Sequence, residues 1–282
     1  MACRQPVELA TDRCTINQYL QQLLCPHSAV ASGEVHAAME YAVFGPAQRI
    51  RPILALRVAR LFNAPVDLTL RAAAAVELFH CASLIVDDLP CMDDAASRRD
   101  REAVHVTFGE STAVLAAFGL VALAARSVLE GTVPGPCRDR LVQFQVSLLQ
   151  SLDCSSLLAG QALDLAMAAS GDAASRTNTN VSDLKTVPLF NLAVSAGALF
   201  ADPDADASAL LSGFGREFGL AFQLSDDLLD GEEEDVASFK EKLSLLRAAT
   251  AHFGPAGLDL EALVEYLNHR VAYQATTAEN RD

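Results

Sequence analysis

Apolar residues recur along most of this chain with the period of an α-helix. Residues 14–42 show the pattern, since Ile16, Tyr19 and Leu23 recur three to four positions apart. A two-residue alternation of apolar and polar positions, which marks half-buried strands, is missing. The periodicity predicts an all-α protein, with further helices at residues 52–62, 67–89, 111–130, 139–170, 183–200, 206–231, 236–252 and 257–273.

Glycines and prolines mark where several of these helices end. Gly45 and Pro46 close the first helical region, and Pro90 stops the helix before it. The polar segment 171–182 is expected to be a loop, and the tail from about residue 275 is expected to be disordered. We therefore expect residues 1–282 to form a single domain, a bundle of about ten helices around a deep central cavity.

Composition narrows the class of protein. Hydrophobic residues make up 51% of the chain and aromatic residues 6%, and tryptophan is absent, a bias that favours helices over strands. The formal net charge of -15 argues against nucleic acid as a partner, because phosphate backbones need a basic surface. The acidic balance suits a protein that collects divalent cations.

The spacing of the cysteines and the hydropathy of the chain predict the cellular compartment of the protein. Seven cysteines at scattered spacings, without a CxxC pair, are typical of reduced thiols in the cytoplasm. The N-terminal stretch lacks the apolar run of a secretory signal, and no charge-free run reaches the roughly 18 residues of a membrane span. We expect a cytoplasmic protein, in which the apolar stretch from Ala113 to Ala125 is a buried helix.

Four carboxylates stand close together in the stretch LIVDDLPCMDD. Asp87 and Asp88 end an apolar helical run, and Asp93 and Asp94 follow after a gap of four residues. Pro90 bends the chain between the two pairs, so Asp93 can return to the face that Asp87 presents. Like charges this close repel unless a cation or hydrogen bonds compensate them.

A second acidic stretch, AFQLSDDLLD, repeats the feature. Asp226 and Asp230 are four residues apart and share one helix face, with Asp227 beside them. Hard carboxylate oxygens favour magnesium, which keeps water ligands and bridges to substrate phosphates. One such motif alone is typical of a solvated helix face or an N-cap, whereas two of them favour magnesium bound to a diphosphate. Arg98 and Arg99, after the first cluster, add guanidinium groups that bind phosphate.

These motifs together resemble those of the trans-type (E-) polyprenyl diphosphate synthase family. The matching stretches are LFHCASLIVDDLPCMDDAASRRD, GQALDL, KTVPLF, FQLSDDLLD and QRIRP, within roughly residues 15–232 and in the family's order. The resemblance implies a fold of the isoprenoid synthase type. It also implies a magnesium-dependent prenyltransferase that condenses isopentenyl diphosphate with an allylic diphosphate. The gap in the first motif resembles that of geranylgeranyl- and farnesyl-type enzymes.

The resemblance implies roles for individual residues. About three magnesium ions would hold the allylic diphosphate, on Asp87, Asp88, Asp93, Asp226, Asp227 and Asp230, with Asp94 a looser candidate. Contacts to the allylic diphosphate are implied for Arg98, Lys185, Thr186 and Gln223, and contacts at the reaction centre for Gln161 and Asp164. Contacts to isopentenyl diphosphate are implied for Gln48, Arg49, His80 and Arg99. Catalysis itself is expected to depend on Asp87, Asp88, Lys185, Gln223 and Asp226.

Three departures from the family pattern leave other functions open. Gln48 stands where the family has a lysine that grips isopentenyl diphosphate. The family's lysine-containing flap after the second motif is missing, with Lys240 or Lys242 as candidate substitutes, and Ala117 and Phe118 replace a glycine–aspartate pair. The alternatives are a terpene synthase of the same fold that acts on an allylic diphosphate alone, and a non-catalytic regulatory subunit of a synthase. The matching isopentenyl diphosphate contacts count against the first, and the six aspartates count against the second.

Product length is expected to depend on the residues just before the first motif. The family's gate lies four and five residues before the first aspartate, at Ser83 and Ala82, and both are small here. Phe79, one turn further, would form the floor of the cavity. The resemblance thus predicts geranylgeranyl diphosphate as the main product, and Ala82→Phe should shorten it. The family is typically homodimeric, so a homodimer is also expected.

Overall fold

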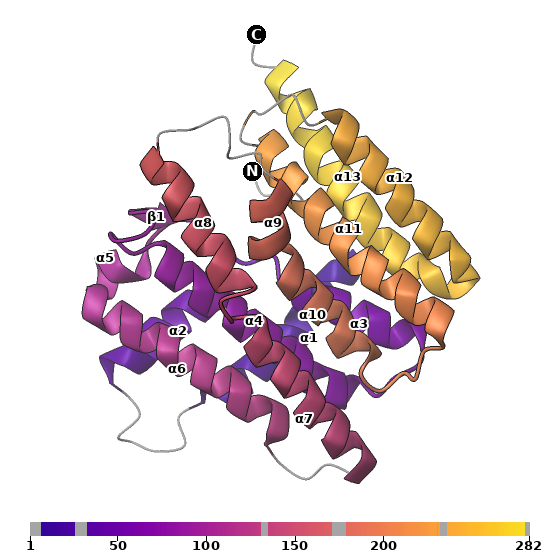
Figure 1. Cartoon of the computed structure of the whole chain (residues 1–282), viewed down its shortest axis with the longest axis horizontal. Coiled ribbons are helices and arrows are strands. Elements are labelled where there is room, and N and C mark those ends of the chain that lie inside the picture. Colours follow the sequence, from indigo (N-terminus) through magenta and orange to yellow (C-terminus); the bar gives the residue numbers. More distant parts are fainter. Residues whose placement is uncertain are drawn as a thin grey trace.

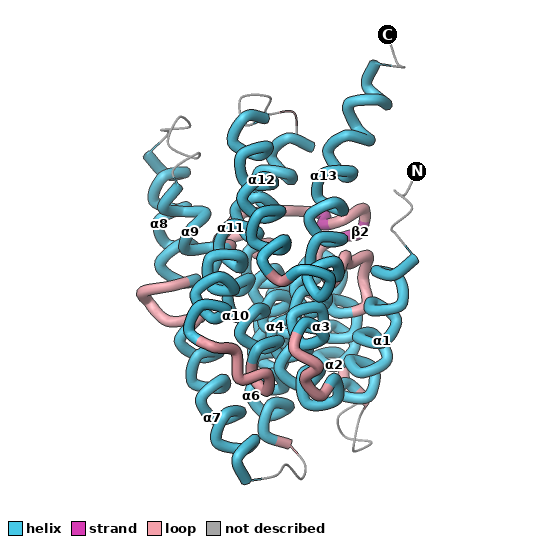
Figure 2. The backbone as a smooth tube through the Cα atoms, turned by 90° about the vertical axis from the view of Figure 1, so that its right-hand side faces the viewer, coloured by secondary structure: helices cyan, strands magenta, loops and turns pink. Residues whose placement is uncertain are grey.

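The computed structural model describes residues 7–25, 33–130, 135–170, 179–229, 231 and 236–279. Within these ranges the chain is a bundle of α-helices with one small hairpin, which confirms the all-α prediction (Figure 1). Most of the helices run along a common direction (Figure 2). The helices are α1 (Val7–Leu24), α2 (Glu34–Val43), α3 (Ile50–Leu61), α4 (Val66–Asp87), α5 (Val104–Phe108), α6 (Glu110–Leu129), α7 (Gly135–Gln150), α8 (Leu157–Ser170), α9 (Thr179–Lys185), α10 (Val187–Ala198), α11 (Ala205–Leu229), α12 (Val236–His252) and α13 (Leu258–Glu279), with a short 3₁₀ helix, η4 (Gly254–Gly257), before the last.

Helices α3 and α4 form the centre of the bundle. Nearly every side chain of α3 is buried, and α4 buries residues on all its sides from Thr69 to Ile85. A helix that is buried all round must be covered on every face. Here α10 packs against both central helices, while α6 packs against α4. The functional side chains carried by α3 and α4 are therefore held by a fully packed core.

One glycine allows α10 to approach α3 closely. A Cβ atom at Gly197 would lie 2.4 Å from the carbonyl oxygen of Ala55 and 2.6 Å from Cβ of Val58. Backbone atoms cannot move aside cheaply in a packed core. Only glycine therefore permits this spacing of the two helices.

The hairpin β1 (Ser97–Arg98) and β2 (Arg101–Glu102) follows the first aspartate motif. Its two-residue turn places Arg99 and Asp100 at positive φ, 54° and 61°, as a tight hairpin turn requires. The strands are antiparallel, with Ser97 opposite Glu102. Strands of two residues leave no alternating pattern in the sequence, so the periodicity did not predict them.

The helix boundaries differ from the prediction in several places. The predicted helix at 139–170 is divided into α7 and α8 by a turn, and the predicted helix at 183–200 is divided into α9 and α10. Helix α13 continues to Glu279, beyond the predicted end at residue 273. Most of the predicted loop 171–182 lies outside the described residues.

Within the described ranges, two helices, α4 and α6, are long and apolar enough to cross a membrane by length and composition. The apolar window of α4 is 72% buried inside the bundle, and that of α6 is 44% buried. Core helices of globular proteins have the same length and composition. The two helices pack against each other in the bundle. The stretch from Ala113 to Ala125, predicted to be a buried helix, is buried on one face only, since Leu115 and Phe118 are 55% and 71% exposed.

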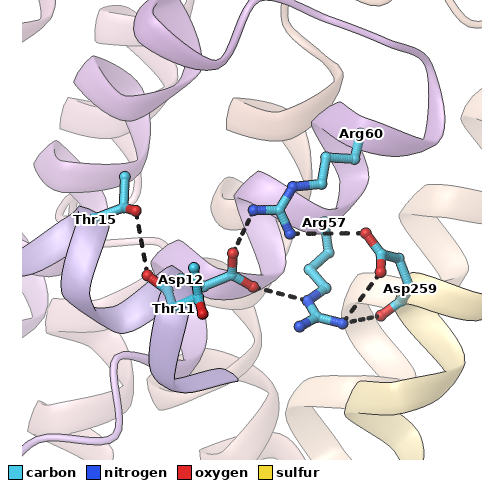
Figure 3. Close-up of polar contacts among 6 residues, drawn as sticks. All are labelled: Thr11, Asp12, Thr15, Arg57, Arg60 and Asp259. Atoms are coloured by element: carbon cyan, nitrogen blue, oxygen red, sulfur yellow. Dashed lines mark hydrogen bonds and ion pairs between the residues drawn. The ribbon is translucent and has the colours of Figure 1, made fainter. Parts of the chain in front are cut away.

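A buried cluster of charges joins α1, α3 and α13, as Figure 3 shows. The guanidinium of Arg57 donates from Nε to Asp12 Oδ2 at 3.0 Å and from Nη1 to the carbonyl oxygen of Asp259 at 3.0 Å. Arg60 donates to the other oxygen of Asp12. Asp12 and Arg57 are each only 1% exposed. Each buried charge therefore depends on its partners, and the cluster fixes the position of α13 against the core.

Candidate functional site

One cavity of about 380 Å³ brings together most of the predicted site residues. Its volume lies in the range of ordinary ligand sites, about 300–1,000 Å³. The predicted residues that line it are Gln48, Arg49, His80, Ser83, Asp87, Arg98, Arg99, Gln161, Lys185, Thr186, Gln223 and Asp226. These residues come from six separate segments of the chain, which the bundle assembles around the opening.

Helical spacing explains how α4 and α11 present their groups. On α4, His80, Ser83 and Asp87 are three and four residues apart, so they follow one face of the helix. On α11, Phe222 and Asp226 stand four residues apart and both line the cavity. Asp87 from α4 and Asp226 from α11 therefore both offer a motif carboxylate to the cavity.

Asp87 occupies an unfavourable place for a charge. Burial raises the pKa of the Asp87 carboxyl from its usual 3.8 to about 6, opposed by the positive charge of Lys185. Asp93 and Asp88 raise it further by repulsion. The ionised form of Asp87 is thus incompletely compensated by the protein, which favours a site that receives a cation.

The other predicted metal ligands are placed differently. Asp88 is buried and accepts bonds at 2.7 and 3.0 Å from Nε of Arg98. Asp93 is exposed in the turn after α4, and its N–H donates to the carbonyl oxygen of Asp87. Asp227 accepts a bond of 2.9 Å from Gln223 Nε2.

Asp230 lies outside the described residues, and Asp94 is exposed at a positive φ of 48°. Among the residues that the structure describes, no group of three or more His, Cys, Asp or Glu side chains is placed to hold a metal ion. A metal at this site would need ligands beyond those side chains.

Positive charge predominates on the cavity wall, although the chain as a whole carries -15. Among the described residues that line the cavity, six arginine and lysine side chains face three carboxylates. The cations are Arg49, Arg51, Arg98, Arg99, Lys185 and Arg270, and the carboxylates are Glu77, Asp87 and Asp226. Such a local excess of cations favours a strongly anionic ligand.

Arg51 is a cavity residue that the sequence reasoning missed. Its Nη1 lies 3.1 Å from His80 Nε2, and its guanidinium lies 4.5 Å from the ring centroid of Phe190. Its buried Nε has no hydrogen-bond partner. Burial lowers the pKa of Arg51 to about 10, so the side chain stays charged at neutral pH.

Arg49, which the sequence did single out, is bound within the protein. Its Nη1 donates to Glu77 at 2.7 Å and its Nε to Asn17 at 2.9 Å, and its Nη2 donates to the carbonyl oxygen of Val43. Arg49 lines the cavity, but its donors are engaged. Of the two arginines in QRIRP, Arg51 has the freer donor for a ligand.

His80 is neutral in this environment. Burial, followed by the charges of Arg51 and Arg99, lowers the pKa of His80 well below its usual value. An arginine can only donate, so His80 Nε2 must accept the bond from Arg51 and the ring proton sits on Nδ1. The histidine therefore orients Arg51.

Polar groups of α8, α9 and α11, and of Thr186 between α9 and α10, meet beside the cavity, although Asp164 is not among the described lining residues. Lys185 Nζ donates to Asp164 at 2.6 Å, and Thr186 Oγ1 donates to Gln223 at 3.2 Å. Gln161 is 7% exposed, and neither its amide nitrogen nor its oxygen has a protein partner. Gln48 Oε1 is likewise buried without a partner. Unsatisfied amides in a cavity wall are typical of a ligand site.

Arg270 and Glu77 are further lining residues that the sequence reasoning did not find. Arg270 belongs to α13 and donates to Asp226, which lies 44 residues earlier in the chain. Glu77 precedes His80 by one helical turn and could have been found from that spacing. No local pattern around Arg270 marks it as a site residue.

The three predicted chain-length residues separate in the structure. Ser83 lines the cavity, and its hydroxyl donates to the carbonyl oxygen of His80 at 3.0 Å. Ala82 and Phe79 are 4% and 1% exposed in the core and are not among the lining residues. Lys242 pairs with Glu217 at 2.7 Å and Lys240 is exposed, and neither lines the cavity.

The sequence is similar to known prenyl diphosphate synthases. It is 37% identical over 233 residues to a geranylgeranyl diphosphate synthase of Pseudescherichia vulneris, covering 80% of this chain and 73% of the relative. It is 32% identical to a farnesyl diphosphate synthase of Geobacillus stearothermophilus, with 92% of each chain covered. It is 36% identical to Geranylgeranyl pyrophosphate synthase 6, mitochondrial, of Arabidopsis thaliana, over 70% of this chain. The chain spans only 60% of the length of that plant relative.

Solved structures share the fold. A geranyltransferase from Legionella pneumophila superimposes with a TM-score of 0.85 at 27% identity, covering 93% of this chain and 96% of that one. An FPP/GFPP synthase from Zymomonas mobilis superimposes with a TM-score of 0.81 at 28% identity, covering 92% and 97%. The polyprenyl synthetase family model matches residues 32–242, about three quarters of the sequence. The cavity, the motifs that line it and these similarities lead to one conclusion: the chain belongs to the polyprenyl synthetase family.

Proposed function

We propose that this protein is a magnesium-dependent prenyltransferase that condenses isopentenyl diphosphate with an allylic diphosphate, with geranylgeranyl diphosphate as the main product. The observation that carries the proposal is the excess of cations around Asp87 and Asp226 at the polar part of a cavity that also has apolar walls. The names of the relatives, geranylgeranyl and farnesyl diphosphate synthases, support the same reaction class.

The donor groups of the cavity fit magnesium. Asp87 and Asp226 offer hard oxygen ligands from two helices, and the raised pKa of Asp87 indicates a carboxylate in need of a cation. Since the described side chains form no three-ligand cluster, diphosphate oxygens and water would complete the coordination, as is usual for magnesium. When bound, magnesium supplies positive charge to the departing diphosphate.

We assign the cavity cations to two diphosphate groups. Arg98, Lys185 and Gln223 would hold the allylic diphosphate, with Thr186 orienting Gln223 through their hydrogen bond. Arg51 and Arg99 would hold isopentenyl diphosphate, with His80 fixing Arg51. Arg49 would act behind them by neutralising Glu77.

The reaction then needs positioning and exclusion of water more than a protein nucleophile. The C–O bond of the allylic diphosphate breaks and the electron pair leaves with the diphosphate. The double bond of isopentenyl diphosphate attacks the resulting cation, and a proton passes to the released diphosphate. The apolar wall formed by Leu84, Leu189 and Phe222 would keep water from the cation.

A terpene synthase remains the second candidate because of Gln48. This amide lines the cavity and brings no charge to the group that would bind isopentenyl diphosphate. An enzyme without isopentenyl diphosphate would release a hydrocarbon or an alcohol from the allylic substrate alone. Arg51, His80 and Arg99 are retained on the wall and favour the transferase.

We also propose a homodimer. Leu115 and Phe118 on α6 are 55% and 71% exposed and three residues apart. Helix α7, which packs against α6, exposes Val146 and Leu149 to 50% and 47%. A second copy of the chain would cover these apolar side chains.

Cytoplasmic localisation stays a prediction, since one relative is named mitochondrial and another, from Catharanthus roseus, chloroplastic.

Product analysis tests the proposed reaction. Purified protein would be incubated with magnesium, isopentenyl diphosphate and dimethylallyl, geranyl or farnesyl diphosphate in turn. Mass spectrometry before and after phosphatase treatment should show longer prenyl diphosphates, which disappear with EDTA. Hydrocarbons or alcohols formed without isopentenyl diphosphate would instead identify a terpene synthase. No turnover with any primer would contradict both and favour a regulatory subunit.

A further inference from the structure

Arg270 brings the last described helix, α13, into the wall of the cavity. Its Nη1 donates to Ser225 Oγ at 2.7 Å, and its Nη2 donates to Oδ1 of Asp226. Its guanidinium also lies 5.0 Å from the ring centroid of Phe222. Phe222 lies three residues before Ser225 and four before Asp226, so the three partners lie close together on the surface of α11 that Arg270 contacts.

The contact with Arg270 places a positive charge next to the Asp226 carboxylate. The side chain of Arg270 is 14% exposed, so water screens its charge only in part. A guanidinium is always ionised and donates hydrogen bonds without accepting any. While it is bound, it occupies one oxygen of Asp226 and repels any other cation that approaches this carboxylate.

Asp88, in the other aspartate motif, has the same arrangement. Arg98 binds both of its oxygens, since Nη2 lies 2.6 Å from Oδ1 and Nε donates to Oδ1 at 2.7 Å and to Oδ2 at 3.0 Å. Each motif therefore has one aspartate bound by an arginine that also lines the cavity. The two arginines stand where a diphosphate could take over their donors.

Contacts away from the cavity fix the position of helix α13. Asp259, in its first turn, belongs to the buried charge cluster with Arg57 (Figure 3). Glu265 of α13 pairs with Arg247 of α12 at 2.8 Å. Arg270 follows Asp259 by three helical turns. The approach of Arg270 to Asp226 is thus fixed by a helix anchored elsewhere in the core.

We propose that Arg270 occupies Asp226 in the ligand-free protein and moves to the diphosphate when magnesium and diphosphate bind together. Arg270 would then keep the affinity for magnesium alone low and couple metal binding to diphosphate binding. The planar guanidinium suits both partners, because carboxylate and phosphate accept the same pair of N–H donors. The inference rests on the proposed function and names a regulatory role for a residue outside the segment matched by the family.

Binding measurements without turnover test this role. Magnesium affinity would be measured by isothermal titration calorimetry with and without inorganic pyrophosphate, for the unchanged protein and for Arg270→Gln. We expect Arg270→Gln to bind magnesium alone about tenfold more tightly, the size of effect that one neighbouring charge has on a carboxylate. The gain in magnesium affinity from pyrophosphate should shrink by a similar factor, because coupling is reciprocal.

Two further variants separate this role from a structural one. Arg247→Gln removes a comparable pair between α12 and α13 away from the cavity and should leave both affinities unchanged. Arg270→Lys keeps the charge but not the fork of donors, and it should fall between the unchanged protein and Arg270→Gln. If Arg270→Gln does not fold, Ser225→Ala takes its place, because it removes one bond to the guanidinium and keeps both charges.

The outcomes are distinct. Equal or weaker binding of magnesium alone by Arg270→Gln, or by Ser225→Ala in its place, would overturn the inference while leaving the proposed function intact. Absence of any coupling between magnesium and pyrophosphate in the unchanged protein would overturn the inference and the proposed function together.

Discussion

Asp87 is the residue at which the needs of folding and of binding conflict most directly. Burial raises the pKa of its carboxyl to about 6, so the folded protein binds this proton more tightly than the unfolded chain does. The resulting stabilisation is fully present below the unfolded pKa near 3.8 and is lost as the pH rises through about 6. At neutral pH, the ionised group weakens the metal-free fold and attracts a cation.

The variant Asp87→Asn should therefore stabilise the metal-free protein at high pH. In EDTA, we expect its melting temperature to exceed that of the unchanged protein by a few degrees at pH 8 and by much less at pH 5. Differential scanning calorimetry at both pH values would measure this. Asp94→Asn is the matched control, since Asp94 is exposed and asparagine also accepts its positive φ. An equal effect of Asp87→Asn at both pH values would contradict the assignment.

Ser83 should control product length more directly than Ala82. Ser83 lines the cavity, whereas Ala82 is buried in the core, where a phenyl ring would overpack its neighbours. We expect Ser83→Phe to shorten the main product by at least one isoprene unit, as mass spectrometry of the prenyl diphosphates would show. Ser83→Ala, which keeps the volume small, should leave the product distribution unchanged. The same products from Ser83→Phe as from the unchanged protein would rule out this gate.

At the same scale, sequence reasoning identified types of residue better than directions of side chains. Asp87 was identified from its motif, and His80 and Lys185 from the resemblance to the family, and all three line the cavity. The spacing of Arg49 and Arg51 does not show which of them has donors available to a ligand. Arg49 takes a positive φ of 56° before α3 begins, so helical periodicity does not predict the direction of its side chain. Such a local backbone conformation is visible only in three dimensions.

Among the elements, α3 has to bury charge as well as apolar surface. Arg57 lies in its centre and is paired with α1 through Asp12 and with α13 through Asp259. A buried charge that loses one partner keeps its desolvation cost. The cluster thus makes the attachment of two outer helices depend on a few polar bonds.

The variant Asp12→Asn should weaken the whole fold. Removing this carboxylate leaves Arg57 buried with a reduced counter-charge, so we expect a loss of about 3 kcal/mol in the free energy of unfolding. Urea unfolding followed by circular dichroism would measure it. Asp202→Asn removes the exposed partner of Arg140 and should change the stability little. A similar small effect of Asp12→Asn would show that the buried cluster contributes nothing.

Elements differed in how well the sequence predicted them. Helices α4 and α11 carry long apolar periods and end in aspartate motifs, so both their type and their role were predictable. The hairpin at 97–102 is set by a two-residue turn, and its strands are too short for a period to appear. Helix α13 was predicted as a helix, but its part in the cavity depends on a contact across 44 residues.

For the whole molecule, the exposed face of α6 and α7 is the feature that a single copy leaves unexplained. Phe118 is 71% exposed, and Leu115 lies one turn away on the same side. If a second copy covers this face, Phe118→Lys should yield a monomer, which light scattering after size-exclusion chromatography would detect. Leu245→Lys on α12, where the leucine is 47% exposed, should leave the molecular mass unchanged. A dimer that survives Phe118→Lys would place the interface elsewhere.

The buried charge cluster also bears on the order in which the protein can be made. Arg57 meets a residue 202 positions later in the chain, and Arg270 comes later still. During synthesis, Arg57 of the central helix α3 lacks its contacts with Asp259 until α13 has left the ribosome. A nascent chain can therefore bury its apolar helices early, yet it cannot complete the wall of its cavity until nearly all of the described chain has been translated.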